Sequence, residues 1–312
     1  MSIRPRRAFA ALLTGVALAL GVTACVPDHR TAPADYISFY SGEPQNPLIP
    51  TNTNENNGGT VIDTLFTGLA QYTPDGEVTM GVADSITPNA NSTQFDIKLK
   101  DGWTFTNGEP VTSDSFIDAW NFGANVNNSQ LQSSFFEPIQ GYDDVAGETD
   151  EDGNVTKEPT AETMSGLKKV SDREFTVTLS APNVAFPNML GFSTFYPLPK
   201  AAFKDMKTFG EHPIGNGPYM FDGDDAWQHN VAITLKANPD YAGNDKPKNP
   251  GISFTMYSST TTAYADLQSG DLDHMREDVG ADAYPSYKAD FPDSHDDKPY
   301  AAIQNFTIPE NL

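Results

Sequence analysis

The side chains that could do chemistry are scattered along this chain and form no known catalytic pattern. The five histidines stand at positions 29, 212, 229, 274 and 295, and no two have the helical spacing of paired metal ligands. The sequence contains no Gly-x-Ser-x-Gly elbow, no glycine-rich phosphate loop and no His-Glu-x-x-His motif. It therefore predicts no catalytic residue, no metal site, no cofactor and a protein that is not an enzyme.

One acidic stretch could hold a cation. Residues 148–153 place carboxylates at alternate positions before a glycine, as an EF-hand calcium loop does. Position twelve of that register is Pro159, which has no side-chain oxygen to act as the bidentate ligand. We therefore interpret the stretch as a solvated acidic loop. Carboxylate pairs abound, so residue type alone leaves a surface glycosidase open as an alternative, beside a surface adhesin.

The clearest chemical motif lies at the N-terminus. Three arginines between positions 4 and 7 precede an apolar stretch, residues 8–22, which is typical of an export signal. The following Thr-Ala-Cys ends at Cys25, and residues 22–25 resemble the lipobox of bacterial lipoproteins. The resemblance implies removal of residues 1–24, a lipid on Cys25, and an extracytoplasmic protein anchored to the cell membrane, at the cell surface or the periplasmic face. The alternative is an ordinary secretory signal with a chance cysteine.

Composition limits the partners and the fold. Cys25 is the single cysteine, so no internal disulfide can form and the chain depends on its hydrophobic core. The formal net charge of −23 argues against nucleic acid and other polyphosphate partners. A length of 312 residues is typical of about two domains. Residues 25–34 are short, polar and proline-containing, which predicts a tether before the first folded element. We expect a monomer.

Hydrophobic periodicity predicts the elements that must position any site. Alternation predicts strands at 37–39, 95–99 and 175–179 and around Ile233 and Phe254, with turns at Asp101-Gly102 and Asn107-Gly108. Helical spacing predicts a helix at 60–69, capped by Thr60 and closed by the proline turn at 72–76. It predicts a second helix that begins at Thr112 or Ser113 and buries Phe116, Ala119, Trp120 and Gly123. A third, short helix is predicted from Thr262 to Gly270. Residues 141–163 read as an acidic surface excursion. The class is mixed α/β (α+β).

Several turn and aromatic motifs occur in the order found in the extracellular solute-binding proteins of ABC importers, the oligopeptide and dipeptide family (family 5). The run at 101–116 (DGWTFTNGEPVTSDSF) closely resembles the signature of that family. The other matching segments are 42–47 (GEPQNP), the helix at 60–69 with Tyr72, 214–219 (IGNGPY), 237–241 (ANPDY) and 267–273 (LQSGDLD). Each segment is common by itself, but chance does not explain all of them in this order and at this spacing.

The resemblance implies a type II periplasmic-binding-protein-like fold, which has two lobes. It places lobe I at 35–71 and 198–300, a subdomain inserted in lobe I at 72–197, and the start of the crossover to lobe II at 301–312. Family members run to roughly 500 residues, beyond the usual size of one domain. The resemblance therefore implies a chain truncated at its C-terminus, with mainly the first lobe and its subdomain among these 312 residues.

The resemblance also implies a function without chemistry. Such proteins capture a solute between two lobes that close by hinge motion, and deliver it to a membrane-embedded ABC permease. A peptide is the expected ligand, and a carbohydrate is the alternative within the family. The candidate ligand-binding residues are Glu43 and Gln45 in the opening turn, Phe135 and Phe136 after the signature helix, and Tyr264. The competing interpretation makes the two phenylalanines part of the core and Glu43 a turn cap.

Overall fold

The computed structural model describes residues 33–276 and 279–298. The predicted signal peptide at 1–24, the lipid site Cys25, most of the tether at 25–34 and the predicted crossover at 301–312 lie outside the described residues. Within the described part of the chain, no helix has the length and hydrophobicity needed to cross a membrane.

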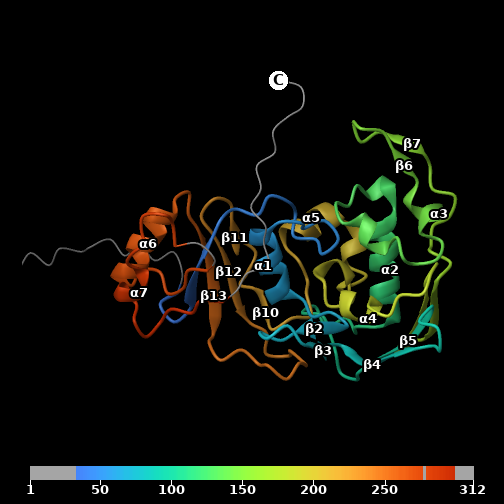
Figure 1. Cartoon of the computed structure of the whole chain (residues 1–312), viewed down its shortest axis with the longest axis horizontal. Helices are drawn as coiled ribbons and strands as arrows, with labels where there is room; N and C mark the ends of the chain where they lie inside the picture. The colour runs from blue at the N-terminus through green and yellow to red at the C-terminus, as the bar shows by residue number, and fades with distance from the viewer. Residues whose placement is uncertain (1–32, 277–278, 299–312) are drawn as a thin grey trace, which may run out of the picture.

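The first sheet is mixed and occupies the middle of the molecule (Figure 1). Its order is β1-β13-β12-β10, with β11 beside β12; β1 runs parallel to β13, and the other pairs are antiparallel. Its strands are β1 (Ile37–Ser41), β10 (Tyr219–Phe221), β11 (Trp227–Gln228), β12 (Ala232–Ala237) and β13 (Gly251–Met256). The pairing therefore joins the start of the described chain to a segment more than half its length away.

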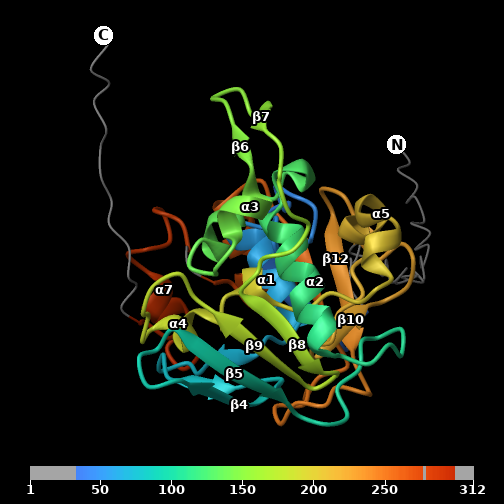
Figure 2. The same cartoon turned by 90° about the vertical axis from the view of Figure 1, so that its right-hand side faces the viewer.

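The second sheet is antiparallel, in the order β4-β5-β9-β8, and packs beside α2 (Figure 2). Its strands are β4 (Ala83–Pro88), β5 (Gln94–Leu99), β8 (Leu167–Ser171) and β9 (Glu174–Thr178). Two separate hairpins are β2 (Ala70–Tyr72) with β3 (Val78–Met80), and β6 (Glu148–Thr149) with β7 (Val155–Lys157). The second hairpin belongs to the predicted acidic excursion, and it projects from the molecule in both views.

The helices are mostly short and connect or cover the sheets. The α-helices are α1 (Asn56–Leu65), α2 (Ser113–Ala124), α3 (Tyr142–Ala146), α4 (Phe186–Met189), α5 (Met206–Glu211), α6 (Thr260–Ser269) and α7 (Tyr287–Asp290). The 3-10 helices are η1 (Val126–Asn128), η2 (Ser133–Phe136), η3 (Ser193–Phe195) and η4 (Ala202–Lys204). The helix predicted to end at Gly270 is α6, which begins two residues before the predicted start, and Gly270 takes the left-handed conformation (φ 86°) that ends it.

The start and end predicted for α1 are wrong. Its N-cap is Glu55, whose carboxylate accepts the backbone N–H groups of Asn57 and Gly58, both at 2.8 Å, so the helix begins about one turn before Thr60. The predicted proline turn does not close the helix. Tyr72 instead ends β2, and the turn joins β2 to β3.

The signature helix is α2, and its prediction is confirmed. Phe116, Ala119, Trp120 and Gly123 are all buried, as their spacing requires. Thr112 is the N-cap, and its backbone N–H donates to the Ser115 hydroxyl at 3.1 Å. The strands predicted around residues 37–39, 95–99, 175–179, 233 and 254 are confirmed as β1, β5, β9, β12 and β13.

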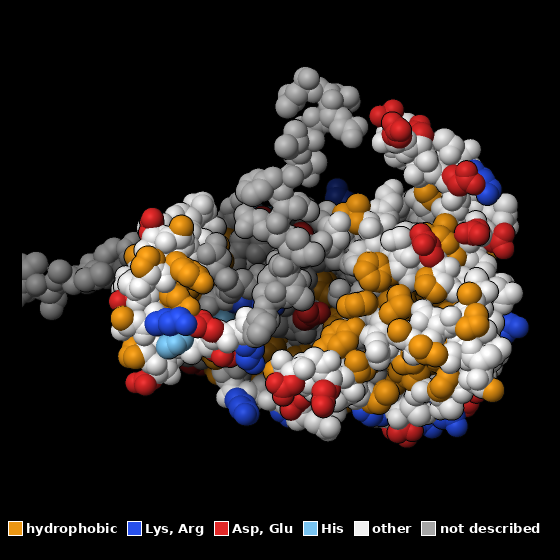
Figure 3. Space-filling model, in the orientation of Figure 1, with side chains coloured by type: hydrophobic (Ala, Val, Ile, Leu, Met, Phe, Trp, Pro, Cys, Tyr) orange, Lys and Arg blue, Asp and Glu red, His pale blue; other side chains and the backbone are white. Residues whose placement is uncertain are grey.

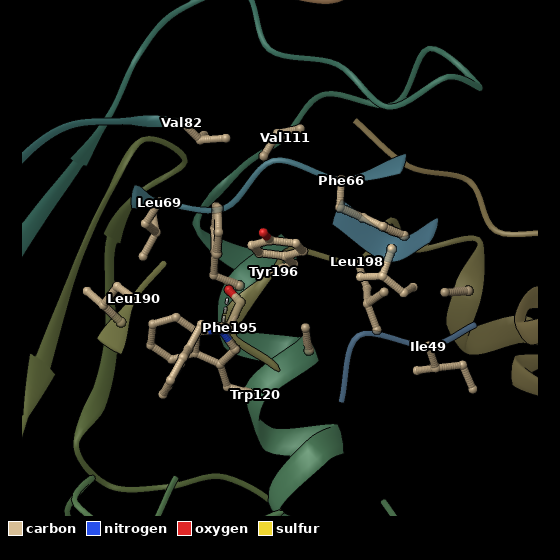
Figure 4. Packing of buried hydrophobic residues seen from close by; sticks show 14 of the residues in the cluster. Ile49, Phe66, Leu69, Val82, Val111, Trp120, Leu190, Phe195, Tyr196 and Leu198 are labelled. Carbon is tan, nitrogen blue, oxygen red and sulfur yellow. Dashed lines mark hydrogen bonds between the residues drawn. The ribbon is translucent and has the colours of Figure 1, made fainter. Parts of the chain in front are cut away.

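Several aromatic side chains pack in the core next to α2, and Figure 4 shows Trp120, Phe195 and Tyr196 among them. Trp120 is fully buried, and its indole N–H donates to the carbonyl oxygen of Phe195 at 3.0 Å. The ring of Phe195 meets the Trp120 ring edge to face, with centroids 5.3 Å apart. Because Tyr196 and Leu198 follow in the same buried segment, this core fixes the part of the chain that packs against α1.

The turn at 214–219 anchors the C-terminal end of α1. The N–H of Gly217 donates to the carbonyl of Leu65 at 2.8 Å. A Cβ atom at position 217 would lie 2.4 Å from the carbonyl carbon of Leu65, so this close approach requires glycine. The Asn216 side chain also accepts from and donates to the backbone of Thr67, both at 3.0 Å. The motif therefore sets the position of α1 against β10.

Candidate ligand-binding face

Three parallel segments present their carboxyl ends on the same side of the first sheet. β1 leads into the turn before α1, β13 leads into α6, and Phe39 of β1 forms a parallel bridge with His274. In open α/β sheets, ligands bind outside the carboxyl ends of the strands. The α1 surface at this edge is therefore the place where the fold favours a ligand.

The outer side of α1 is polar and open. Asn56, Thr60 and Asp63 follow one another at helical spacing on the side away from the buried Val61, Ile62 and Leu65. A Cβ atom on Gly59 would meet nothing within 4 Å, so the helix surface there is free of covering side chains.

Asp63 is the carboxylate at the centre of this surface. Its Oδ1 accepts the hydroxyl hydrogen of the buried Tyr196, with 3.0 Å between the oxygens. The side chain remains exposed at its outer edge, yet desolvation by the surrounding protein raises the pKa of the carboxyl, against the opposing effects of the Tyr196 hydrogen bond and of Arg276. A cationic group of a ligand would therefore gain from contact with Asp63.

Arg276 lies next to the same helix. One of its guanidinium nitrogens, Nη1, is 3.4 Å from the Thr60 hydroxyl, one turn before Asp63 on α1. The face thus offers a cation and an anion near each other. Because the side chain of Arg276 is exposed, its charge is accessible from solvent.

An aromatic surface formed by Tyr72, Phe135 and Phe192 continues from this face. The ring of Phe192 lies 5.8 Å from that of Tyr72 and 5.7 Å from that of Phe135, centroid to centroid. Tyr72 is 43% exposed and Phe192 is 45% exposed, which is unusual for adjacent large rings. Phe192 directly precedes η3, which packs against α1. In Figure 3, hydrophobic side chains gather on the part of the molecule that contains α4.

Comparison with known proteins decides the class of this molecule. Residues 77–310 match the family described as bacterial extracellular solute-binding proteins, family 5 middle. The chain belongs to this family. Its members are binding proteins, which confirms the prediction that the chain is not an enzyme.

The curated relatives of this family 5 protein are named for peptides. The oligopeptide-binding protein OppA of Bacillus subtilis is 29% identical over 250 residues, which are 78% of this chain and 44% of the relative. The dipeptide-binding protein of Lactococcus lactis is 26% identical over 211 residues, 66% of this chain and 36% of the relative. The chain spans less than half the length of these relatives.

Solved structures confirm the fold of this family 5 protein. Haemophilus influenzae OppA, in complex with RPPGFSPFR, superposes with a TM-score of 0.71 at 22% identity. The superposition covers 82% of this chain and 48% of that structure. The predicted mixed α/β, type II periplasmic-binding-protein fold is therefore confirmed for the described residues.

The two candidates in the opening turn have different surroundings. The Glu43 carboxylate is engaged on both oxygens: Oε1 lies 2.7 Å from Nδ1 of His229, and Oε2 accepts the N–H of Asn230 at 2.7 Å. Gln45 is exposed, and its backbone N–H donates to Glu55 at 3.3 Å. Glu43 thus bridges two segments of the protein that are distant in sequence, whereas the Gln45 side chain is exposed.

The three aromatic candidates also differ in their surroundings. Phe136 is fully buried against Phe195 and Trp120, so the structure places it in the core and not on a ligand surface. Tyr264 is 7% exposed, and its hydroxyl donates to Asp290 at 2.6 Å, which ties α6 to α7. Phe135 is half-buried, and it is the one candidate that belongs to the aromatic surface.

The residues that dominate the face did not appear among the sequence candidates. Asp63 had a usable signal, because it is the charged position opposite the apolar stripe of a helix. Tyr72 was assigned to a turn, and Phe192 and Arg276 carry no local pattern that predicts exposure next to α1. The calcium-like stretch at 148–153 forms the β6–β7 hairpin, and the described residues contain no cluster of three His, Cys, Asp or Glu side chains suited to a metal ion.

The Glu43 bridge predicts a pH-dependent contribution to stability. His229 lies between two carboxylates, with Nε2 3.0 Å from Glu211, and the hydrogen bond to Glu43 raises its pKa above the ordinary 6.5. The contact with the carboxylates stabilises protonated His229, which is why the pKa is raised in the folded protein. The contribution of the contact to folding stability is therefore complete below pH 6.5 and disappears as the pH rises through the pKa of the folded state. The melting temperature of His229→Gln should fall below that of the unsubstituted chain at about pH 5.5 and approach it near pH 8.5.

The control for this prediction is His295→Gln, which removes an exposed histidine from a segment remote in sequence. It should show no comparable pH-dependent difference. A deficit in His229→Gln that is constant with pH, or grows as the pH rises, would contradict the bridge.

Proposed function

We propose that the protein is an extracytoplasmic receptor that captures peptides at the α1 face and delivers them to a membrane-embedded ABC permease. We call the outer side of α1 (Asn56, Thr60 and Asp63), together with the neighbouring Arg276, the α1 face. The family assignment and the peptide-binding names of the relatives support the class of ligand. The observation that carries the proposal to this chain is Asp63, an exposed carboxylate that accepts a hydrogen bond from the buried Tyr196 beside an exposed aromatic surface.

The chemistry of the face suits a peptide with free ends. A peptide amino terminus is an ammonium group, which pairs with a carboxylate such as Asp63. Arg276, near the same helix, supplies a guanidinium for a ligand carboxylate. The exposed rings of Tyr72 and Phe192 offer apolar area to side chains of different shapes, so the surface favours breadth over selectivity for one residue.

Lobe I and its inserted subdomain, as we propose them, each contain one of the two sheets. All strands of the first sheet fall within residues 35–71 and 198–300, which we propose as lobe I. All strands of the second sheet fall within residues 72–197, which we propose as the inserted subdomain. The α1 face belongs to the first of these units, and Tyr72 and Phe192 come from the second, which borders it.

A mixed peptide pool tests the class of ligand. The full chain is incubated with di- to octapeptides and, separately, with a pool of oligosaccharides, and the retained ligands are identified by mass spectrometry after gel filtration. The proposal expects peptides of varied side-chain composition in the retained fraction. Retention of oligosaccharides without peptides would replace the peptide assignment by the carbohydrate alternative.

Anchoring through Cys25 is a separate proposal, supported by the signal pattern at 1–24. In bacterial cells fed a clickable palmitate analogue, the unsubstituted chain should carry the label and sediment with membranes. Cys25→Ala should carry no label and leave the membrane fraction, because a lipid anchor is its expected attachment. Equal labelling of both forms would contradict the lipid site, and release of an unlabelled, processed chain would favour the ordinary secretory signal.

A further inference from the structure

A hollow of ≈ 440 Å³ opens on α2, and none of its lining residues belongs to the α1 face. We call it the α2 hollow; the lining residues used below are Asp118, Asn121, Phe122, Glu162, Lys200 and Phe203. They come from α2, from the segment before β8 and from the segment around η4. Three chain segments thus build it.

The charged groups of the α2 hollow are not neutralised by contacts with one another. Among the described residues, the Asp118 and Glu162 carboxylates and the Lys200 ammonium group make no hydrogen bond or ion pair with a side chain. Desolvation, followed by the charge of Asp114, raises the pKa of the Asp118 carboxyl, while Lys200 acts in the opposite direction from a distance. The hollow therefore has two acceptors and one strong donor available to a ligand.

Asn121 adds an unsatisfied donor to the wall. Its Oδ1 accepts the N–H of Met164 at 2.8 Å, which fixes the orientation of the amide. Its Nδ2 is buried and has no hydrogen-bond partner among the described residues. A buried donor without a partner is unfavourable, so a ligand oxygen that reaches it after a small side-chain movement would relieve that cost.

Two phenyl rings supply the apolar part. Phe122 and Phe203 meet edge to face with centroids 5.8 Å apart, and Phe203 is 38% exposed. An exposed ring beside unpaired charges is a surface on which an apolar side chain can pack while its polar atoms reach the rim.

We propose that the α2 hollow binds a small zwitterion with an apolar side chain, such as a free amino acid. The ammonium group pairs with Asp118 and Glu162, the carboxylate pairs with Lys200 and Asn121, and the side chain packs on Phe122 and Phe203. The hollow contains two carboxylates, those of Asp118 and Glu162, but only the one ammonium group of Lys200 among the lining residues named above. This excess of negative charge disfavours an anionic ligand. Pairing with the Asp118 and Glu162 carboxylates also favours an ammonium group over the neutral hydroxyls of a sugar.

The test is a titration of the full chain with L-leucine and L-phenylalanine, followed by NMR chemical shifts, with glucose and N-acetyl-leucinamide as comparison probes. Asp118→Asn and Phe203→Ala should each weaken amino-acid binding by about tenfold or more, because each removes one of the two complementary parts. The matched controls Asp84→Asn and Tyr284→Ala, which replace an exposed carboxylate and an exposed ring elsewhere, should change it less than about twofold.

Other outcomes overturn the proposal. Absence of saturation up to about 50 mM amino acid would do so, as would equal binding of glucose or of the uncharged leucine derivative. Loss of amino-acid binding in Asp63→Asn, with retention in Asp118→Asn, would move the amino acid to the α1 face. Because Asp118→Asn is expected to leave peptide capture at the α1 face unchanged, failure of this proposal and failure of the proposed function give different results.

Discussion

Replacing Trp120 by alanine is expected to lower the free energy of unfolding by about 3–5 kcal/mol, as for other fully buried tryptophans. The side chain is fully buried and contacts the rings of Phe116, Phe136, Phe175 and Phe195. The substitution leaves a cavity among these rings and removes the indole donor from the Phe195 carbonyl. Because this core supports the segment that packs against α1, loss of packing here should also disturb the α1 face.

Urea unfolding followed by circular dichroism measures this effect. The matched control is Trp227→Ala, which removes a half-buried tryptophan whose indole nitrogen has no partner among the described residues. We expect that control to cost about 1–2 kcal/mol. A Trp120→Ala variant no less stable than Trp227→Ala would contradict the central place of Trp120 in the core.

Replacing Asp63 by asparagine is expected to weaken the binding of a peptide with a free amino terminus by about 10- to 100-fold. A hydrogen bond to a charged group contributes about 1.5–3 kcal/mol, and about 1.4 kcal/mol corresponds to a factor of ten in affinity. Asparagine retains an oxygen that can accept from the Tyr196 hydroxyl, so the variant removes the charge with little change in local packing.

A double-mutant cycle separates the charge from general damage to the face. The affinities of a free peptide and of its N-acetylated form are measured by calorimetry for the unsubstituted chain and for Asp63→Asn. Acetylation should weaken binding to the unsubstituted chain strongly and to the variant hardly at all. Asp84→Asn, an exposed carboxylate of β4, should respond to acetylation as the unsubstituted chain does. Equal acetylation effects in all three proteins would exclude an ammonium partner at Asp63.

Local sequence patterns predicted the elements whose formation depends on nearby residues. Phe116 and Trp120 marked the buried side of α2, and the alternation of Phe95 with Ile97 marked β5, because these apolar periods leave one arrangement that buries them. The sequence pattern did not predict where α1 begins, because Glu55 is a less usual N-cap than serine or threonine and because the Gly58-Gly59 pair lowers helix propensity.

Pairings between distant segments could not be predicted in this way. The parallel pairing of β1 with β13 depends on contacts between segments separated by most of the chain, and no local period encodes its register. The family resemblance supplied the fold class instead.

The candidate site depended even more on these distant contacts. Asp63 is a candidate partner for a ligand because the buried Tyr196 donates a hydrogen bond to its carboxylate and because Arg276 lies next to the same helix. Neither neighbour is close in sequence. Glu43 illustrates the reverse case, since its position in a family motif could not show that His229 and Asn230 occupy both carboxylate oxygens. Residue type and order therefore predict a class of protein more reliably than the contacts of one side chain.

Photo-crosslinking locates the bound peptide most directly. A retained peptide carrying a benzophenone side chain is irradiated with the full chain, and the attachment sites are mapped by mass spectrometry. The account predicts attachment on the outer side of α1 and on the aromatic surface of Tyr72, Phe135 and Phe192. Attachment confined to the second sheet or the α2 hollow, with none on α1 or those three rings, would contradict peptide capture at the α1 face.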